Sequence, residues 1–362
     1  MNRLIIIGNG FDIAHGLKTK YSEMLEHYLS ALHSKLSSSG KYSDSFIEIS
    51  HWLECPADYE SFKEQFLNNT IDSNSKDFNG EKRILIIDSQ GRRKYFRQRK
   101  FMFNLLKDHC QKWVDVENTY MKLIIENGNT KKEIEEINKD FEIFRKLMIS
   151  YLKKQDEEIV VNDDIMKIFD SDKSYNNMIL DFNYTGTSEK YAKRLNEVDE
   201  NNQEKQRFET IKIHGNLYDE NNPPILGIGD EHNKELVQVS EYDNLNSLFK
   251  YNKSVHYLMN DNYKKLLKFL NDNPNIQVEI FGHSCGRSDR TLLKFIFENK
   301  NVKRIQVNYH DIKENFLDLI IEVYRHFDDK QMYREKVLDF SKVLRIPQTQ
   351  KNYTREVCEI TS

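Results

Sequence analysis

Short apolar runs that end in polar, glycine-containing turns recur along the chain, and helical patterns separate them. The first run, residues 3–7, is aliphatic and breaks abruptly into Gly8-Asn9-Gly10. A run of this length, closed by glycine and followed by helical periodicity, is typical of a buried parallel strand that enters a turn. Similar strand patterns lie at 178–182, 211–213, 278–281 and 304–309. Strands that alternate with helices predict an α/β fold with a doubly wound, mainly parallel sheet.

The stretch between the first two strand patterns has a different character. Residues 18–40 have the pattern of one amphipathic helix, and residues 41–174 are helical and charge-rich, with a strand-like run only at 84–87. The basic and aromatic segment 92–100 is interpreted as the solvated start of a helix, because its charges spread around the helix. Contact with a phosphate backbone is the alternative. We therefore predict a nucleotide-binding α/β core formed by 1–40 and 175–362, with a mostly helical insertion at 41–174.

One carboxylate interrupts an apolar stripe of the insertion. Apolar side chains recur there at alternating spacings of four and three, at Leu106, Cys110, Trp113, Tyr120 and Ile124. Glu117 occupies the remaining position of the stripe. A carboxylate that faces a core is costly unless it is paired or takes part in a reaction. Two interpretations stay open, a core ion pair with an arginine and a functional carboxylate.

The glycines concentrate where strands end. Of the 13 glycines, nine lie in the strand-end segments: Gly8, Gly10, Gly16, Gly186, Gly215, Gly227, Gly229, Gly282 and Gly286. Ligands of an open parallel sheet bind at the carboxyl ends of the strands, so these turns are expected to form one crevice. Glycine at Gly8 and Gly10 lets the backbone take φ > 0 and come close to a ligand, because no Cβ stands in the way. The pattern predicts a nucleotide site, although Ile13 replaces the third glycine of the dinucleotide fingerprint.

Length, charge and cysteine content narrow the class of protein. The 362 residues suffice for one large domain or a domain with a large insertion. The formal net charge of −4 argues against a general nucleic-acid binder. No apolar run approaches the roughly 18–20 residues of a membrane span, and no secretory leader precedes the first strand. The scattered cysteines (Cys55, Cys110, Cys285 and Cys358) fit a reducing compartment. These features predict a cytoplasmic protein without membrane partners.

The first of three chemical interpretations places a nucleotide in the crevice. The turn from Gly8 to Asp12 receives the phosphates, while the Asn183 amide and the His214 imidazole meet at the ribose. Cleavage of a glycosidic bond then requires that the protein hold the sugar, orient a water and accept its proton. Histidine suits proton transfer because imidazole titrates near neutral pH, and an amide both donates and accepts hydrogen bonds. Hydrogen bonding within a turn or the core is the alternative role for either residue.

The second interpretation is a serine hydrolase. Gly282-His283-Ser284-Cys285-Gly286 fits G-x-S-x-G between a strand and a helix, and His214-Gly215 resembles an oxyanion loop. The residues after Gly286 must then supply the other two triad members, for which Asp311 and His326 are candidates. This interpretation gives no role to the first glycine turn or to Asn183.

The third interpretation is a metal-dependent phosphoesterase or nuclease. Residues of metal-ligand type stand on the predicted turns, at Asp12, His15, His214, Asp230, His232 and His283. Such sites need several ligands at tight spacing, and D-x-x-H at the first turn matches this poorly. We therefore expect no metal.

Five segments together resemble the bacterial abortive-infection AbiH family: residues 8–17, 113–117 and 183–185, His214-Gly215 and Gly282-His283-Ser284. Their order and spacing match over most of the chain. The resemblance implies a role in anti-phage defence, in which an infected cell dies or stops growing before the phage matures. A nucleotide substrate, a phage-derived trigger and a homo-oligomer are the partners that we consider; nucleic acid is not expected.

More distantly, the turns look like those of Rossmann-like, sirtuin-like NAD-binding domains, over about residues 1–30 and 175–310. There a Gly-x-Gly-x-Ser turn, a Thr-x-Asn-Tyr-Asp segment, a His-Gly and a late Gly-x-Ser line the NAD pocket. On that match, Asn183 and His214 fall on the residues with which defence-type sirtuin-like enzymes hydrolyse NAD. The residues on the phosphate turn are Gly8, Gly10 and Asp12, and those on the ribose-side turn are Gly282 and Ser284.

The chain departs from the sirtuin-like pattern at two turn positions. Asp12 replaces the serine, and a carboxylate beside a pyrophosphate is unfavourable unless it points away or binds a metal. Thr185 stands where the pattern has aspartate. The zinc module of deacetylating sirtuins is absent, so the resemblance does not imply deacetylation.

Together these arguments predict an NAD-hydrolysing defence protein, with NAD as its substrate. His214 is the expected base or sugar contact, Asn183 orients water or ribose, and Glu117 is a third polar group. The residues expected to bind NAD are Gly8, Asn9, Gly10, Phe11, Asp12, His15, Tyr184, Gly215, Gly282, His283, Ser284 and Asp289. The non-enzymatic alternative keeps the same pocket as a nucleotide-sensing module that controls a partner through the insertion.

Overall fold

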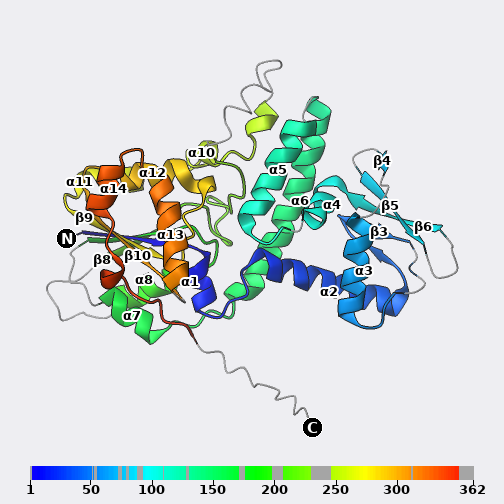
Figure 1. Ribbon diagram of the computed structural model, residues 1–362, viewed down its shortest axis with the longest axis horizontal. Helices are drawn as coiled ribbons and strands as arrows, with labels where there is room; N and C mark the ends of the chain where they lie inside the picture. Colours follow the sequence, from blue (N-terminus) through cyan, green and yellow to red (C-terminus); the bar gives the residue numbers. More distant parts are fainter. Residues whose placement is uncertain are drawn as a thin grey trace, which may run out of the picture.

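The computed structural model describes residues 2–50, 52, 55–71, 76–78, 81–87, 93–108, 110–127, 130–170, 176–197, 207–229, 246–310 and 313–349. It contains a five-stranded parallel sheet and a five-stranded antiparallel sheet. The parallel sheet and its helices form one side of the molecule, and the second sheet lies on the other with α2–α6 (Figure 1). No helix in the described ranges is long and apolar enough to cross a membrane.

The parallel sheet confirms the predicted α/β fold. Its strands are β1 (Asn2–Ile7), β7 (Asn176–Asp181), β8 (Arg207–Lys212), β9 (Ile276–Phe281) and β10 (Val302–Asn308). Their spatial order is β10-β9-β1-β7-β8, and every neighbouring pair is parallel. The chain thus builds outward from β1 to β8 and then returns to build the other half from β9. The reversal falls between β1 and β9, which is where doubly wound sheets bind ligands.

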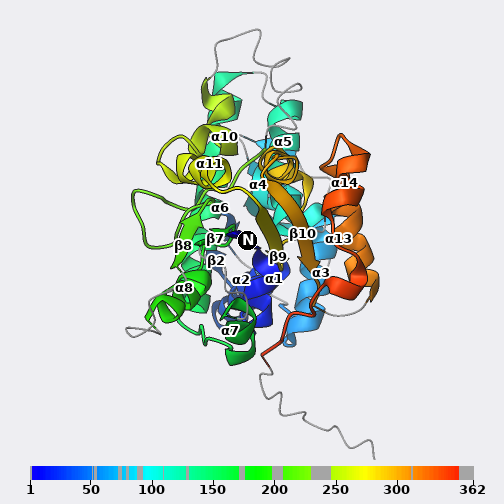
Figure 2. The same cartoon turned by 90° about the vertical axis from the view of Figure 1, so that its left-hand side faces the viewer.

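Both faces of the parallel sheet are covered, which explains the continuous apolar runs. Successive side chains of a strand point to opposite faces, so Leu4 and Ile6 lie in one buried cluster, and Ile5 and Ile7 lie in another. The first cluster includes side chains of α11 (Asn262–Asp272), α12 (Arg290–Phe297) and α13 (Lys313–Arg325). The second includes side chains of α1 (Asn9–Ala14), α7 (Asp163–Asp170) and α8 (Thr187–Glu197). Figure 2 shows α11 and α8 on opposite sides of β8, with α13 and α14 (Lys330–Lys336) beside β10.

Long helices form much of the insertion, as expected. Helix α2 (Tyr21–Ser39) leads from the core to α3 (Tyr59–Ile71), and α4 (Lys100–Lys107), α5 (Trp113–Asn127) and α6 (Lys131–Asp156) follow. Their apolar side chains share one buried cluster, which includes many aromatic rings. Helix α7 lies within the predicted insertion by sequence but packs against α8 in the core. The division of the chain into core and insertion stays a prediction.

The antiparallel sheet of the insertion was largely unexpected. Its strands are β2 (Tyr42–Ser43), β3 (Ile47–Ile49), β4 (Lys76–Phe78), β5 (Glu81–Ile87) and β6 (Arg93–Arg99), in the order β2-β3-β6-β5-β4. The strand-like run at 84–87 is part of β5, but the helix start predicted for 92–100 is wrong, since 93–99 form β6. Phe96 and Gln98 are buried and Arg97 between them is exposed. This alternation is that of a strand, and the sequence conceals it because one buried residue is polar.

The first two glycines do not use the left-handed conformation that glycine permits. Gly8 has φ −131°, and Gly10 lies inside α1. Both are needed because the turns after β1 and β9 contact each other: the Gly10 N–H donates to the Gly282 carbonyl at 2.8 Å. A Cβ on Gly8 would lie 2.6 Å from His283 Cα, and one on Gly10 would lie 2.8 Å from Gly282 Cα. Gly282 itself has φ +69°.

Replacement of Gly282 by alanine is expected to destabilise the fold. The new Cβ would lie 2.1 Å from the Phe11 nitrogen, and a left-handed backbone costs about 1–2 kcal/mol in a residue with a Cβ. Gly282→Ala should therefore lower the free energy of unfolding in urea by at least about 2 kcal/mol. Gly186→Ala is the control, because its Cβ meets nothing nearer than 3.5 Å. Equal stability of the two variants would contradict this account.

Candidate functional site

A cavity of about 590 Å³ opens at the carboxyl ends of the parallel strands. It is bordered by the turns after β1, β7, β8 and β9, whose convergence the glycine pattern predicts, and by the first residues of α2 and α5. Ligand pockets usually measure about 300–1,000 Å³. The cavity thus has the size and the place in the sheet of a ligand site, and both the core and the insertion form its walls.

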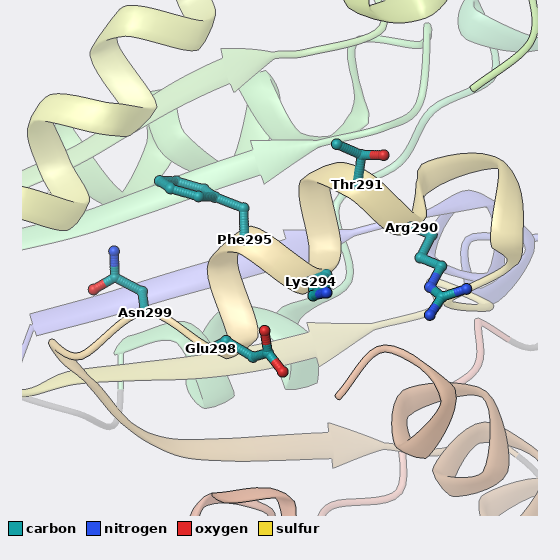
Figure 3. Close-up of a pocket in the computed structure, with 6 residues that line it drawn as sticks. All are labelled: Arg290, Thr291, Lys294, Phe295, Glu298 and Asn299. Carbon is teal, nitrogen blue, oxygen red and sulfur yellow. The ribbon is translucent and has the colours of Figure 1, made fainter. Parts of the chain in front are cut away.

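A second hollow, of about 670 Å³, lies on the outer side of α12. Figure 3 shows its six residues on α12 and at the end of that helix, with no strand-end turn among them. Lys294 in this hollow forms an ion pair with Asp328. The strands in Figure 3 point toward the end of α12 that carries Arg290, which is the end nearer the first cavity. The cavity at the strand ends is therefore the candidate site.

A buried lysine joins the insertion to the core at this cavity. Lys253 of α10 (Lys253–His256) is 3% exposed, and its Nζ lies 3.0 Å from Glu117 Oε1 and 3.1 Å from Asp289 Oδ1. Burial acts to lower the pKa of Lys253, but Asp289 and Glu117 raise it above its ordinary value. Burial raises the pKa of Glu117, and Lys253 opposes this rise. The ion-pair interpretation of Glu117 thus holds, but its partner is a lysine and not an arginine.

Asp289 links this lysine to two histidines. Its Oδ1 lies 3.2 Å from His214 Nε2, and its Oδ2 lies 3.7 Å from His283 Nε2. Burial acts to raise the pKa of Asp289, but Lys253 and His214 hold it well below its ordinary value. Asp289 is therefore ionised and only accepts hydrogen bonds. His214 Nε2 is thereby favoured as the protonated nitrogen, and Tyr257 Oη lies 3.0 Å from the same atom.

His283 has a defined neutral form. The Cys285 N–H donates to His283 Nδ1 at 3.0 Å, so the proton of the neutral ring lies on Nε2. Burial lowers the pKa of His283 to about 4, although Asp289 acts in the opposite direction. The Phe182 ring contacts both histidines, with its centroid 4.9 Å from that of His214 and 4.2 Å from that of His283.

Asn183 connects the turns after β1 and β7. Its Nδ2 donates to the Gly8 carbonyl at 3.0 Å, and its backbone N–H donates to Asp181 Oδ1 at 2.8 Å. Its Oδ1 accepts no hydrogen bond from the residues that the structure describes. The adjacent Tyr184 hydroxyl donates to the Ile225 carbonyl at 3.0 Å. One half of the Asn183 amide thus holds the turns together, while the other half is available to a ligand.

The carboxylate of Asp12 points toward two threonines. Thr185 Oγ1 donates to it at 2.6 Å and Thr187 Oγ1 at 2.7 Å. Burial raises the pKa of Asp12 to about 7, and these two hydrogen bonds oppose the rise. The two departures from the sirtuin-like pattern, Asp12 and Thr185, therefore contact each other as a carboxylate and a hydroxyl.

Nearly all residues of this site lie within the part of the chain that matches a known family. The model of the family described as bacteriophage abortive infection AbiH matches residues 4–311. The chain belongs to the AbiH family. Membership indicates a role in abortive infection, a defence against bacteriophages. No curated protein matches the chain.

Three residues expected to bind the nucleotide do not line the cavity of this AbiH-family chain. Phe11 is buried and stacks on Phe169 at 5.9 Å between ring centroids. His15 Nδ1 lies 2.7 Å from the Phe11 carbonyl, and its Nε2 lies 2.6 Å from the Tyr191 hydroxyl. Gly215 has φ +91° and lies against Pro223. The other expected residues do line it: Gly8, Asn9, Gly10, Asp12, Glu117, Asn183, Tyr184, His214, Gly282, His283, Ser284 and Asp289.

Several cavity residues of this AbiH-family chain carry no motif in the sequence that marks them as part of a site. Besides Lys253, three carry buried polar atoms that have no hydrogen-bond partner among the described residues: Tyr21 Oη, Asn308 Nδ2 and Asn315 Oδ1. An unpartnered buried polar group is costly, so a ligand that bonded to these atoms would relieve that cost. Asn308 ends β10, and the strand-end argument that selected the other turns applies to it equally.

The described residues do not form the contacts that a serine hydrolase or a metal-dependent enzyme needs. Ser284 is exposed, and no histidine or carboxylate among the described residues is hydrogen-bonded to its Oγ. His326 Nε2 instead lies 2.7 Å from the Cys285 carbonyl, and Asp311 lies outside the described residues. Within the described part of the chain, no three His, Cys, Asp or Glu side chains are placed to hold a metal ion together. Asp230 and His232 of the metal interpretation lie outside it.

The pKa of Asp12 predicts a pH-dependent stability. Because the pKa rises from 3.8 to about 7 on burial, the folded protein binds this proton more tightly than the unfolded chain does. The free energy of unfolding should then fall as the pH rises from about 4 to about 7. Between pH 5 and pH 8, the free energy of unfolding in urea should fall about 2–3 kcal/mol less in Asp12→Asn than in the wild type. The exposed Asp272→Asn is the control and should keep the wild-type slope; a wild-type slope in Asp12→Asn would refute the assignment.

Proposed function

We propose that this AbiH-family protein binds NAD and hydrolyses the bond between nicotinamide and ribose, which depletes NAD in infected cells. The observation that carries the proposal is the shared cavity: His214, the Asn183 amide and the first glycine turn border one space at the reversal point of the sheet. A cytoplasmic location and the need for a phage-derived trigger stay predictions.

The charge around the cavity supports a pyrophosphate ligand. Helices α2 and α5 both begin at the cavity, and the amino-terminal end of a helix attracts anions. Lys20 and Lys112 stand at these two ends and are exposed. In this proposal the phosphates lie near the turn of Gly8 and Gly10, and the ribose next to nicotinamide lies between Asn183 and His214. The second ribose lies near Gly282 and Ser284.

The proposed reaction uses His214 Nδ1 and Asn183 Oδ1, two atoms that no described residue binds. The bond between ribose C1′ and nicotinamide breaks, its electron pair moves to the ring nitrogen, and the sugar becomes oxocarbenium-like. A water oxygen bonds to C1′ and gives its proton to His214 Nδ1, since Nε2 faces Asp289. Asn183 Oδ1 accepts a hydrogen bond from the water or from a ribose hydroxyl. Asp289 stabilises the imidazolium that forms, and Glu117 holds Lys253 in place.

Loss of either group should abolish hydrolysis. His214→Ala and Asn183→Ala are expected to lower the rate of nicotinamide release from NAD at least about 100-fold, because each removes a group that acts on the water or the sugar. Nicotinamide and ADP-ribose are measured by chromatography with purified protein and with protein from phage-infected cells, which contain any trigger. His256→Ala, outside the cavity, is the control. NAD that is bound and stays intact under both conditions would contradict hydrolysis and favour the sensing alternative.

Asp289 should set the protonated nitrogen of His214. In Asp289→Asn the carboxylate acceptor is replaced by an amide that also donates, so the Nε2–H form of His214 should lose population, and hydrolysis should fall at least about tenfold. Nitrogen-15 NMR of histidine-labelled protein reports the tautomer directly. Tyr257→Phe removes the other neighbour of Nε2 and should preserve the Nε2–H form. The same tautomer in wild type and Asp289→Asn would exclude this role.

A further inference from the structure

A groove of about 820 Å³ lies next to the cavity. Its walls are one face of α5 in the insertion and three elements of the core: η3 (Arg287–Asp289), the start of α12 and the end of α13. Four residues border both spaces: Lys112, Val114, Ser284 and Ser288. The groove and the cavity are therefore adjacent, with these side chains at their common border.

The groove is cationic although the chain as a whole has a net charge of −4. Its positive side chains are Lys112, Lys122, Arg287, Arg290 and Arg325, against the carboxylates of Glu126 and Glu322. Arg325 pairs with Glu322, and Lys122 Nζ lies 3.3 Å from Asp108. Arg287 is exposed and forms no ion pair with the described residues. As far as the described part of the chain goes, its guanidinium is thus available to an anion.

Among the residues that the structure describes, three carboxylates line the cavity, and each is already bound within the protein. Asp12 is bound by two threonines, and Glu117 and Asp289 are bound by Lys253. In dinucleotide sites a carboxylate binds the ribose 2′-hydroxyl of NAD, whereas an arginine accommodates the 2′-phosphate of NADP. In this chain the described carboxylates are bound within the protein and Arg287 is not, which matches the pattern of NADP sites.

We propose that the groove binds a phosphate on the second ribose, so that the preferred nucleotide is the 2′-phosphorylated one, NADP. The inference rests on the proposed function, which places that ribose near Gly282 and Ser284. Ser284 borders both spaces, so a 2′-phosphate on this ribose enters the groove. Arg287 binds it through paired N–H donors, and the neighbouring cations add to the attraction.

The test measures binding and needs no turnover. Isothermal titration calorimetry compares ADP-ribose with ADP-ribose 2′-phosphate on the full chain, since neither carries a nicotinamide bond to cleave. The wild type should bind the 2′-phosphate at least about tenfold more tightly. Arg287→Glu should reduce this preference to less than about threefold while binding of ADP-ribose is kept. Arg304→Glu makes the same charge change at an exposed position of β10 outside the groove and should retain the preference.

Each outcome separates this inference from the proposed function. Equal affinity of the two nucleotides for the wild type overturns the groove assignment alone. A preference that survives in Arg287→Glu also overturns it, because the phosphate then binds elsewhere. Failure of both nucleotides to bind overturns the proposed function and this inference with it. Thermal unfolding of both variants verifies that they fold.

Discussion

The site depends on one buried ammonium group. Lys253 neutralises a carboxylate from the insertion and a carboxylate from the core, and neither would be tolerated inside the protein alone. The pairing fixes α5 against the turn after β9 and keeps Asp289 ionised beside His214. The same ion pairs of Lys253 therefore hold the insertion in place and set the charge beside His214. A substitution of Glu117 would therefore alter the charge near His214, because Lys253 contacts both Glu117 and Asp289.

The hydrogen bonds of the cavity separate structural groups from available ones. Asp12, Glu117 and the Nδ2 of Asn183 are occupied in holding turns and helices together. Among the described residues, three atoms at strand ends have no hydrogen-bond partner in the protein: the Oδ1 of Asn183, the Nδ1 of His214 and the Nδ2 of Asn308. These atoms come from three different strand ends. Their convergence is a consequence of the parallel sheet, whose carboxyl ends all meet at one edge.

The sequence was sufficient for the sheet and for the position of the cavity. Aliphatic runs such as residues 3–7 predict buried strands, and the rule for parallel sheets then places Asn183, His214 and the glycine turns at one edge. The sequence was insufficient for Lys253. Its partners lie 136 and 36 residues away, and nothing in Lys253-Ser254-Val255-His256 indicates that this lysine is buried. It was also insufficient for β6, where the buried Gln98 hides the alternation. Both failures have the same cause, since the deciding neighbours are distant in sequence.

The topology also determines when the cavity can exist. The central strand β1 is translated first, yet it pairs only with β7 and β9, whose last residues are Asp181 and Phe281. Until the ribosome has passed Phe281, this strand lacks one of its two neighbours, and the turns that enclose the cavity are not all present. A truncated or still-growing chain is therefore without an assembled site. In this AbiH-family chain, any function that needs the cavity therefore begins only after the strand that ends at Phe281 has been made.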